Sequence, residues 1–289
     1  MQIHLRTRGI PRGLDYTFLN SAPVSRWWDA YADWTATERP CLLAVTEDGE
    51  EDWRVLLSGI PSVRADSGGR LIYYTLVLEG AYDTAQEDAA VVLSLASRLL
   101  ADLEQDEQGR GVLSGLLDSI CPAAEVDRLL AAPSEYAMDR KELTTRLLAS
   151  VTSLEPVPYG APVAGRGRAD RWIAGRSAPG ASAAFLARLS ALLSGKEQGQ
   201  AHLLNLVSEA EDVAELFPGR LAVLVEGGKV GDPAMPLERL PEPKAPPGPP
   251  VPSPLPKVWW RTPMAQASLA ALVLLLCVAG VLWIWGVLF

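Results

Sequence analysis

Alternating and continuous apolar runs in the first 83 residues predict a β-rich region. Residues 3–8 alternate polar and apolar side chains, and residues 14–19 form a second candidate strand. Such alternation places one face of a strand on a core. The run LIYYTLVL at 71–78 is rich in β-branched and aromatic residues, which is typical of a central strand. A short helix is expected at 24–34, where three aromatic residues share one face.

Two hairpins are expected in the same region. One pairs residues 41–46 with residues 53–57 across the polar turn EDGEED. The other pairs residues 63–64 with residues 71–78 across ADSGGR. The segment LSGIPS between the two hairpins therefore separates two distinct strands in this prediction.

The pattern changes to a helical period at residue 84. The segment 84–105 carries apolar side chains at helical spacing, and Thr84 with Glu87 forms a capping box. Shorter helices are expected over LSGLLDSI, over AAEVDRLLAA and over residues 139–153. This block is interpreted either as a small helical bundle or as a helical layer over the sheet.

Short strands and helices alternate after a loop rich in Pro, Gly and Arg that begins at residue 154. Strands are expected at 171–174, 201–207 and 221–225, and helices at 181–194 and 209–216. A β-α-β-α-β order is typical of a parallel α/β unit.

Proline dominates the segment that follows. Twelve of the 23 prolines lie between residues 233 and 263. Proline lacks an amide donor and cannot sit inside a helix or a sheet ladder. The segment therefore predicts an extended polyproline spacer with a rise of about 3.1 Å per residue.

No charged residue occurs from Thr262 to Phe289, and the segment is apolar on every face. It exceeds the roughly 20 residues that cross a hydrocarbon core, so it predicts a transmembrane helix. Two aromatic pairs mark its ends as the two membrane interfaces: Trp259 with Trp260, and Trp283 with Trp285. Ala267 and Ala271 form one small-xxx-small pair, which makes a homo-oligomer conceivable beside a plain anchor.

The flanking charges predict the orientation of this helix. Lys257 and Arg261 lie just before the span and no basic residue follows it. The positive-inside rule then places the preceding residues in the cytoplasm. Because the Ala, Leu, Arg and Pro bias suggests a bacterial source, the predicted location is the inner membrane, with a single-pass C-terminal anchor.

Together these patterns predict an α+β fold with a β-rich N-terminal region (1–83), a helical region (84–153), a short α/β region (154–232), a Pro-rich linker (233–262) and one C-terminal transmembrane helix (263–289).

Charge and the scarcity of metal ligands narrow the function classes. The net charge is −9, and an acidic surface repels phosphate backbones, so no nucleic-acid partner is expected. The chain has three cysteines and two histidines without a CxxC pair. A zinc site is therefore not expected, and no cofactor is predicted.

The best candidate for ligand chemistry is the Arg/Gly stretch before the helix at 181–194. It contains Arg166, Arg168, Arg171 and Arg176 among flexible glycines. Guanidinium forks and free amides at a helix N-terminus suit an anionic ligand. A solvated loop whose arginines pair with acidic neighbours is the alternative, because no GK[ST] follows and a Walker A motif is excluded.

Three other groups carry weaker signals. Trp27, Trp28 and Trp34 form a dense aromatic group that suits either a partner interface or packing against the sheet. The acidic residues at 47–52 lack the spacing of a calcium loop and read as a charged hairpin tip. The segment 6–12 holds three arginines, which favour either an anion-binding strip or edge-strand protection.

The opening IHLRTRGIPRGLDYTFLN, with the LLSGI and YYTLVLEG strands, resembles the N-terminal domains of a class of accessory proteins. These are encoded beside GTPases or MoxR-type ATPases in bacterial conflict (defence) gene clusters. The resemblance covers about the first 80 residues. It implies a recognition domain joined to a membrane segment, and no site residue is carried over from it.

Three functions stay open at this stage. The first is a membrane-tethered adaptor or effector whose cytoplasmic body binds a protein partner, because the anchor and spacer occur without a catalytic signature. The second is a membrane-bound enzyme or sensor for an anionic small molecule such as a nucleotide. The third is a structural component of an envelope or secretion complex. The absence of a nucleophile or acid–base signature favours a non-enzymatic role.

Overall fold

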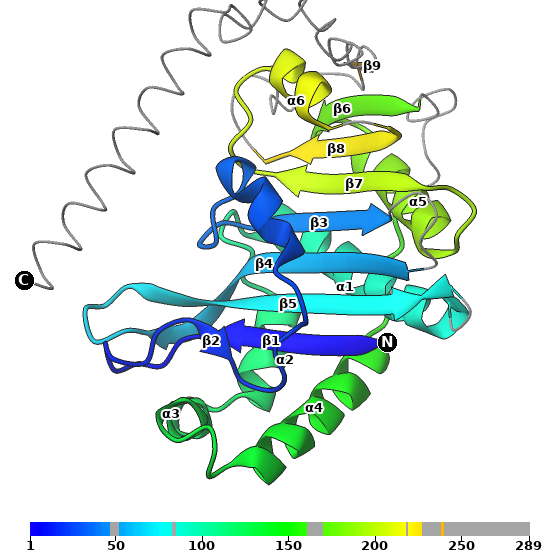
Figure 1. Cartoon of the computed structure of the whole chain (residues 1–289). Coiled ribbons are helices and arrows are strands. Elements are labelled where there is room, and N and C mark those ends of the chain that lie inside the picture. The colour runs from blue at the N-terminus through cyan, green and yellow to red at the C-terminus, as the bar shows by residue number, and fades with distance from the viewer. Residues whose placement is uncertain (47–51, 83–84, 161–169, 218, 227–237, 240–289) are drawn as a thin grey trace, which may run out of the picture. The chain divides into compact units, whose positions relative to one another are not determined.

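The computed structural model describes residues 1–46, 52–82, 85–160, 170–217, 219–226 and 238–239. These residues belong to one compact unit, Met1–Pro243. They form a nine-stranded mixed sheet in the order β2-β1-β5-β4-β3-β7-β8-β6-β9 (Figure 1). The predicted α+β fold is confirmed in these coarse terms. One sheet joins strands of the β-rich N-terminal region and of the short α/β region, the helical region adds no strand to it, and β9 lies within the range predicted as the Pro-rich linker.

Five strands of the N-terminal region build one antiparallel half of the sheet. They are β1 (Gln2–Thr7), β2 (Thr17–Phe18), β3 (Cys41–Thr46), β4 (Asp52–Ala65) and β5 (Leu71–Ala81). The expected strand at 14–19 shortens to two residues. The expected helix at 24–34 is a 3-10 helix, η1 (Trp27–Trp34).

The other half of the sheet is the parallel unit that the β-α-β-α-β order predicts. Strands β7 (Gly199–Leu204) and β6 (Arg171–Gly175) both pair in parallel with β8 (Leu221–Val225), which lies between them. Strand β3 joins the halves by pairing antiparallel with β7. A two-residue strand, β9 (Glu238–Arg239), pairs antiparallel with β6.

The helical region is a layer over the sheet. Its helices are α1 (Ala85–Gln105), α2 (Val112–Ile120), α3 (Ala123–Ala131) and α4 (Ala137–Thr152). The α/β region adds α5 (Ala181–Leu193) and α6 (Ala210–Leu216). Helices α1, α2, α4 and α5 lie behind the sheet in Figure 1, whereas η1 and α6 lie in front. Among the described helices, the longer ones therefore pack on one face of the sheet, and the short helices η1 and α6 pack on the other.

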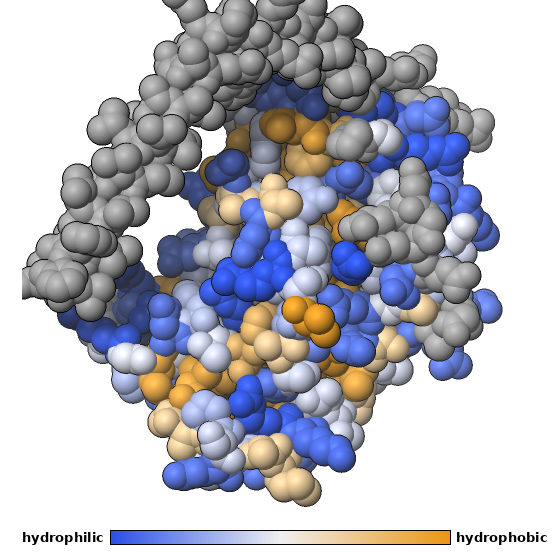
Figure 2. Space-filling model, in the orientation of Figure 1, coloured by the Kyte–Doolittle hydropathy of each residue, from blue (hydrophilic) through white to orange (hydrophobic). Residues whose placement is uncertain are grey.

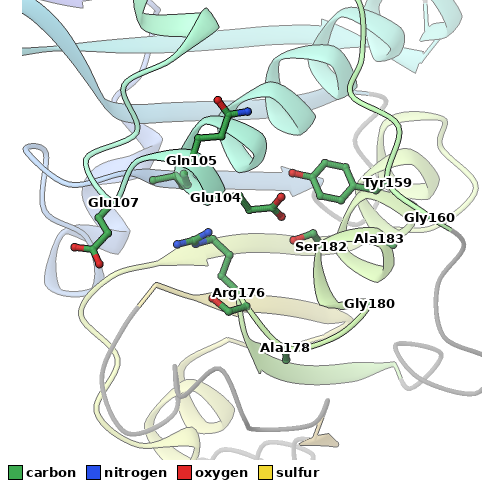
Figure 3. A pocket seen from close by; sticks show the side chains of 12 residues that line it. Glu104, Gln105, Glu107, Tyr159, Gly160, Arg176, Ala178, Gly180, Ser182 and Ala183 are labelled. Carbon is green, nitrogen blue, oxygen red and sulfur yellow. The ribbon is translucent and has the colours of Figure 1, made fainter.

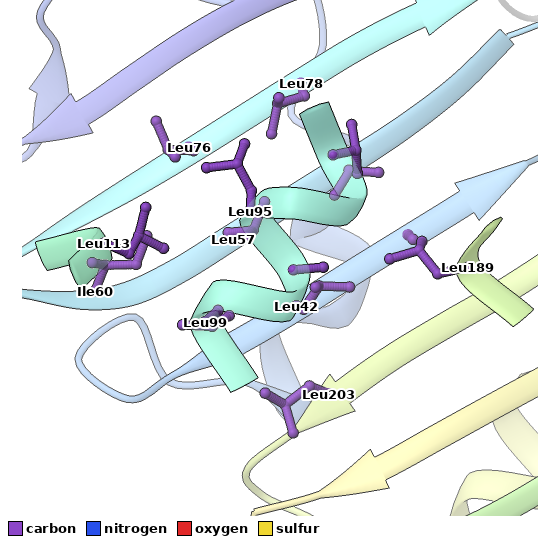
Figure 4. Close-up of a cluster of buried hydrophobic side chains, with 14 of the residues drawn as sticks. Leu42, Leu57, Ile60, Leu76, Leu78, Leu95, Leu99, Leu113, Leu189 and Leu203 are labelled. Atoms are coloured by element: carbon purple, nitrogen blue, oxygen red, sulfur yellow. The ribbon is translucent and has the colours of Figure 1, made fainter. Parts of the chain in front are cut away.

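Each face of the sheet has its own apolar core. The larger core joins the strands to α1, α2 and α5, as the leucines of Figure 4 show. It follows the strand alternation, since Leu42 faces α1 and the next residue, Leu43, belongs to the second core. That second, smaller core packs under η1 and α6.

The prediction that LSGIPS divides two strands is wrong. Strand β4 runs through the segment with a register shift between Leu57 and Ile60. Gly59 at the shift has a φ of 69°, and a Cβ there would lie 2.1 Å from the Arg39 backbone. The glycine signals a bulge in one long strand, which the turn-like composition concealed.

A side chain protects the edge of β1. The Asn20 amide accepts from the Leu5 amide at 2.9 Å and donates to the Ile3 carbonyl at 2.7 Å, so it substitutes for a neighbouring strand. The Arg140 guanidinium donates to the Leu19 carbonyl at 2.8 Å and fixes the same segment from α4. Asn20 therefore covers part of the β1 edge that β2 leaves unpaired.

Asp102 of α1 caps the first turn of α2 from a buried position. Its carboxylate accepts the amides of Val112 at 3.0 Å and Leu113 at 2.8 Å. Burial raises the pKa of Asp102 above 3.8, although the two amides act in the opposite direction. The folded state therefore binds this proton more tightly than the unfolded chain does.

The stability contributed by that tighter proton binding is present below pH 3.8 and is lost as the pH rises through the raised pKa. The Asp102→Asn variant removes this dependence. We expect the unfolding free energy of the wild type, minus that of Asp102→Asn, to fall across this window in urea titrations. A difference that stays constant or rises would contradict the assignment.

Candidate functional site

A cavity lies at the carboxyl edge of the parallel strands. Its volume is about 640 Å³, within the usual range for small-molecule sites. It lies between the end of α1, the segment at Tyr159 and Gly160, and the loop from β6 to α5 (Figure 3). Ligands of open parallel sheets bind at this edge, where connections leave toward opposite faces.

Arg176 is the predicted ligand residue that reaches this cavity. It follows the last residue of β6, and its amide donates to the Val225 carbonyl at 3.0 Å. The guanidinium forms a fork with the Glu226 carboxylate, with Nε–Oε2 at 2.7 Å and Nη2–Oε1 at 3.2 Å. The positive charge is thus compensated inside the protein.

Acidic groups outnumber this guanidinium in the lining. Glu104 and Glu107 of the α1 end also line the cavity. Figure 3 shows the Tyr159 hydroxyl and the Glu104 carboxylate directed toward each other beside Ser182. Burial, and after it the charge of Glu104, raises the pKa of Tyr159, so its hydroxyl stays neutral. The described lining disfavours a polyanion.

Arg171 does not join Arg176. Arg171 opens β6 at the opposite end of the strand, where its guanidinium is buried. It donates to the carbonyls of Ala214 at 2.7 Å and Gly219 at 3.3 Å, beside the C-terminal end of α6. Arg166 and Arg168 lie outside the described residues, in the segment that begins after the cavity residue Gly160.

The membrane-interface residues also lie outside the described part of the chain. They are Lys257, Trp259, Trp260, Arg261, Trp283 and Trp285. Among the described helices, none combines the length and the apolar character that a bilayer crossing requires. Within the same residues, no cluster of three or more His, Cys, Asp or Glu side chains is arranged to hold a metal ion.

The second candidate is an aromatic surface on η1, defined by Trp27, Trp28, Tyr31 and Trp34. All four side chains pack on the second core, yet none is fully buried. Trp27 and Trp28 meet edge to face at 5.9 Å between ring centroids. Aromatic packing therefore orders this short helix while leaving part of each ring exposed.

Phe217 connects the aromatic surface to α6. Its ring stacks on Tyr31 at 5.7 Å with an interplanar angle of 7°, and meets Trp34 at 5.8 Å. The His202 ring lies below at 5.2 Å from both Tyr31 and Phe217. Burial lowers the pKa of His202 to about 3, so this imidazole is a neutral packing element and not a base at pH 7.

An exposed aliphatic residue adjoins the aromatic surface. It is Leu206, which lies just after β7. Leu206 donates its amide to the Trp34 carbonyl at 3.3 Å, so the strand end after β7 is fixed to η1. Exposed apolar groups gathered at one place are typical of interaction sites.

The sequence flagged part of both candidates. It grouped the tryptophans but missed Phe217, whose role depends on α6 packing beside η1. It found Arg176 but missed Glu226 and Tyr159. Arg176 and Glu226 each follow a parallel strand directly, and polar residues at that position were the available signal.

Comparisons with protein-family models, with curated proteins and with solved structures give no match for this chain. The choice between the two candidates therefore rests on their geometry. The cavity neutralises its arginine internally, whereas the aromatic surface leaves apolar area exposed. The aromatic surface is the better supported site.

Proposed function

We propose that this chain is a membrane-tethered adaptor that binds a protein partner through the aromatic surface of η1. The observation that carries the proposal is the incomplete burial of all four aromatic side chains of η1. Trp and Tyr dominate the binding energy of protein interfaces because they remove large, rigid areas from water. Among the described helices, η1 and α6 are the ones on this face of the sheet (Figure 1).

The tethering half of the proposal draws on the sequence. Residues 263–289 form a span that anchors the chain in the inner membrane, and Lys257 with Arg261 keeps the body on the cytoplasmic side. The Pro-rich linker at 233–262 gives the body reach from the bilayer. A place in a bacterial conflict system is part of the same proposal.

Site-specific photo-cross-linking tests the partner half. A benzophenone amino acid replaces Ala30, which is exposed on η1, in the full chain in its source membranes. We expect a covalent adduct with one other protein, and we expect Trp28→Ala to abolish it. The control replaces Met138, which is exposed on α4 behind the sheet, and no adduct is expected there. Equal adducts at both positions would refute a specific surface.

Binding of an anionic small molecule is the second candidate function. The place of Arg176 in the cavity favours it, and the Glu226 partner of Arg176 with the acidic lining makes it the weaker of the two. Under this alternative, nucleotides would raise the melting temperature of the full chain, because a ligand that binds only the folded state stabilises it. Arg176→Ala would abolish that shift, because Arg176 is the described arginine of the cavity lining. The absence of any nucleotide-induced shift would remove this candidate.

A further inference from the structure

Exposed acidic side chains lie on η1 and on α6, the two helices that the Tyr31–Phe217 contact joins. Asp29 and Asp33 are exposed on η1 itself. Helix α6 adds Glu211, Asp212 and Glu215, all exposed. Because Phe217 at the end of α6 stacks on Tyr31, this acidic helix is held against η1. Figure 2 shows this face, where hydrophilic and hydrophobic residues are intermixed around η1.

Within the described residues, most of these carboxylates have no partner of opposite charge. Asp29 pairs with Arg26 at 3.2 Å. Asp33, Glu211, Asp212 and Glu215 make no ion pair with another residue in the described part of the chain. Glu211 and Asp212 also suit the positive end of α6, whereas Asp33 and Glu215 have no such role. The negative charge of Asp33 and Glu215 is therefore not compensated within the described residues.

The protein already contains the contact that a basic partner would make. The Arg26 guanidinium lies 5.9 Å from the centroid of the Trp28 ring while it pairs with Asp29. A cation over an indole face gains from the ring quadrupole, and a nearby carboxylate adds to the attraction. On this surface a tryptophan face beside a carboxylate thus holds a guanidinium, that of Arg26 itself, and a partner would have to displace Arg26 or use the other rings and carboxylates.

We infer that the aromatic surface binds a basic peptide segment of the protein partner, in which arginine or lysine side chains alternate with apolar anchors. The inference rests on the proposed function and specifies its partner. The same acidic side chains repel anionic lipids and nucleic-acid phosphates, so neither of these covers the rings. Complementary charge would also accelerate association and make binding salt-dependent.

Peptide selection tests this chemistry. The full chain is reconstituted in phosphatidylcholine nanodiscs and offered a random dodecapeptide display library. Retention of each enriched peptide is then compared between the wild type and Trp28→Ala. We expect the peptides that Trp28→Ala retains at least about 10-fold less well to carry net positive charge.

A charge-neutral variant separates electrostatics from packing. Asp33→Asn with Glu215→Gln is expected to weaken the best of these peptides about 10-fold at low salt, and the loss should shrink at high salt. The matched control, Glu135→Gln with Glu142→Gln, removes two exposed carboxylates on the α3–α4 side and should change binding less than about twofold. Unfolding curves of both variants check that the fold is retained.

Each other outcome overturns the inference in a distinguishable way. If the Trp28-dependent peptides are neutral or acidic, the partner is not basic although the docking surface stands. If no enriched peptide depends on Trp28, the proposed function fails together with the inference. Trp28-dependent binding to phosphatidylserine vesicles would assign the surface to lipid and overturn the peptide assignment.

Discussion

Deletion of residues 263–289 is expected to move nearly all of the protein from the membrane pellet to the supernatant. The segment has no charged residue, and its apolar side chains gain their free energy only inside the hydrocarbon core. A spanning helix is effectively irreversible in its insertion, so the effect should be close to all-or-none. The measurement is the distribution of the protein after a carbonate wash of bacterial membranes.

A second deletion provides the control for the anchor. Removal of residues 241–256 shortens the Pro-rich linker but leaves the span and its flanking Lys257 and Arg261. This variant should remain in the carbonate-washed pellet. If the chain without residues 263–289 also stays in the pellet, or if the full chain washes off, the tether is not this segment.

Trp53→Ala is expected to lower the free energy of unfolding by about 3–5 kcal/mol, the range for truncating a buried aromatic residue. Trp53 of β4 is completely buried in the larger core. Its ring lies against Gly80 of β5, where an added Cβ would come within 2.3 Å. A loss of this size is a large part of the stability of a typical domain, so a sizeable unfolded fraction is expected at 37 °C.

Val63→Ala is the matched control for Trp53→Ala because it lies in the same strand. Its side chain is 85% exposed, so it should change the unfolding free energy by less than about 0.5 kcal/mol. Chemical denaturation of both variants measures the difference. Similar losses in the two variants would contradict the burial of Trp53 and the exposure of Val63.

Local sequence patterns predicted where the helices and strands lie better than they predicted which strands pair in the sheet. The parallel unit followed from the β-α-β-α-β order, because parallel strands require helical crossovers. The pairing of β1 with β5 could not be predicted from local patterns. The two strands are far apart in the sequence, and their pairing depends on the core that they share. The bulge at Gly59 was concealed because glycine and proline are typical of turns as well as of bulges.

Site residues were predictable where a single local signal sufficed. The tryptophan cluster of η1 stood out in the sequence, but its exposure depends on which face of the sheet it covers. Arg171 and Arg176 looked alike in the Arg/Gly stretch. The strand residues 172–175 separate them, so Arg171 supports α6 while Arg176 lines the cavity. Only the tertiary arrangement distinguishes these two roles.

The dissociation constant of the partner captured at Ala30 tests the central claim most directly. It should be measured for the full-length wild type, for Trp28→Ala and for Tyr136→Ala, which removes a half-buried aromatic side chain at α4. The aromatic surface predicts that Trp28→Ala weakens binding by about 2 kcal/mol, or about 30-fold, while Tyr136→Ala leaves it unchanged. Unchanged binding by Trp28→Ala, or an equal loss in both variants, would contradict a partner site on η1.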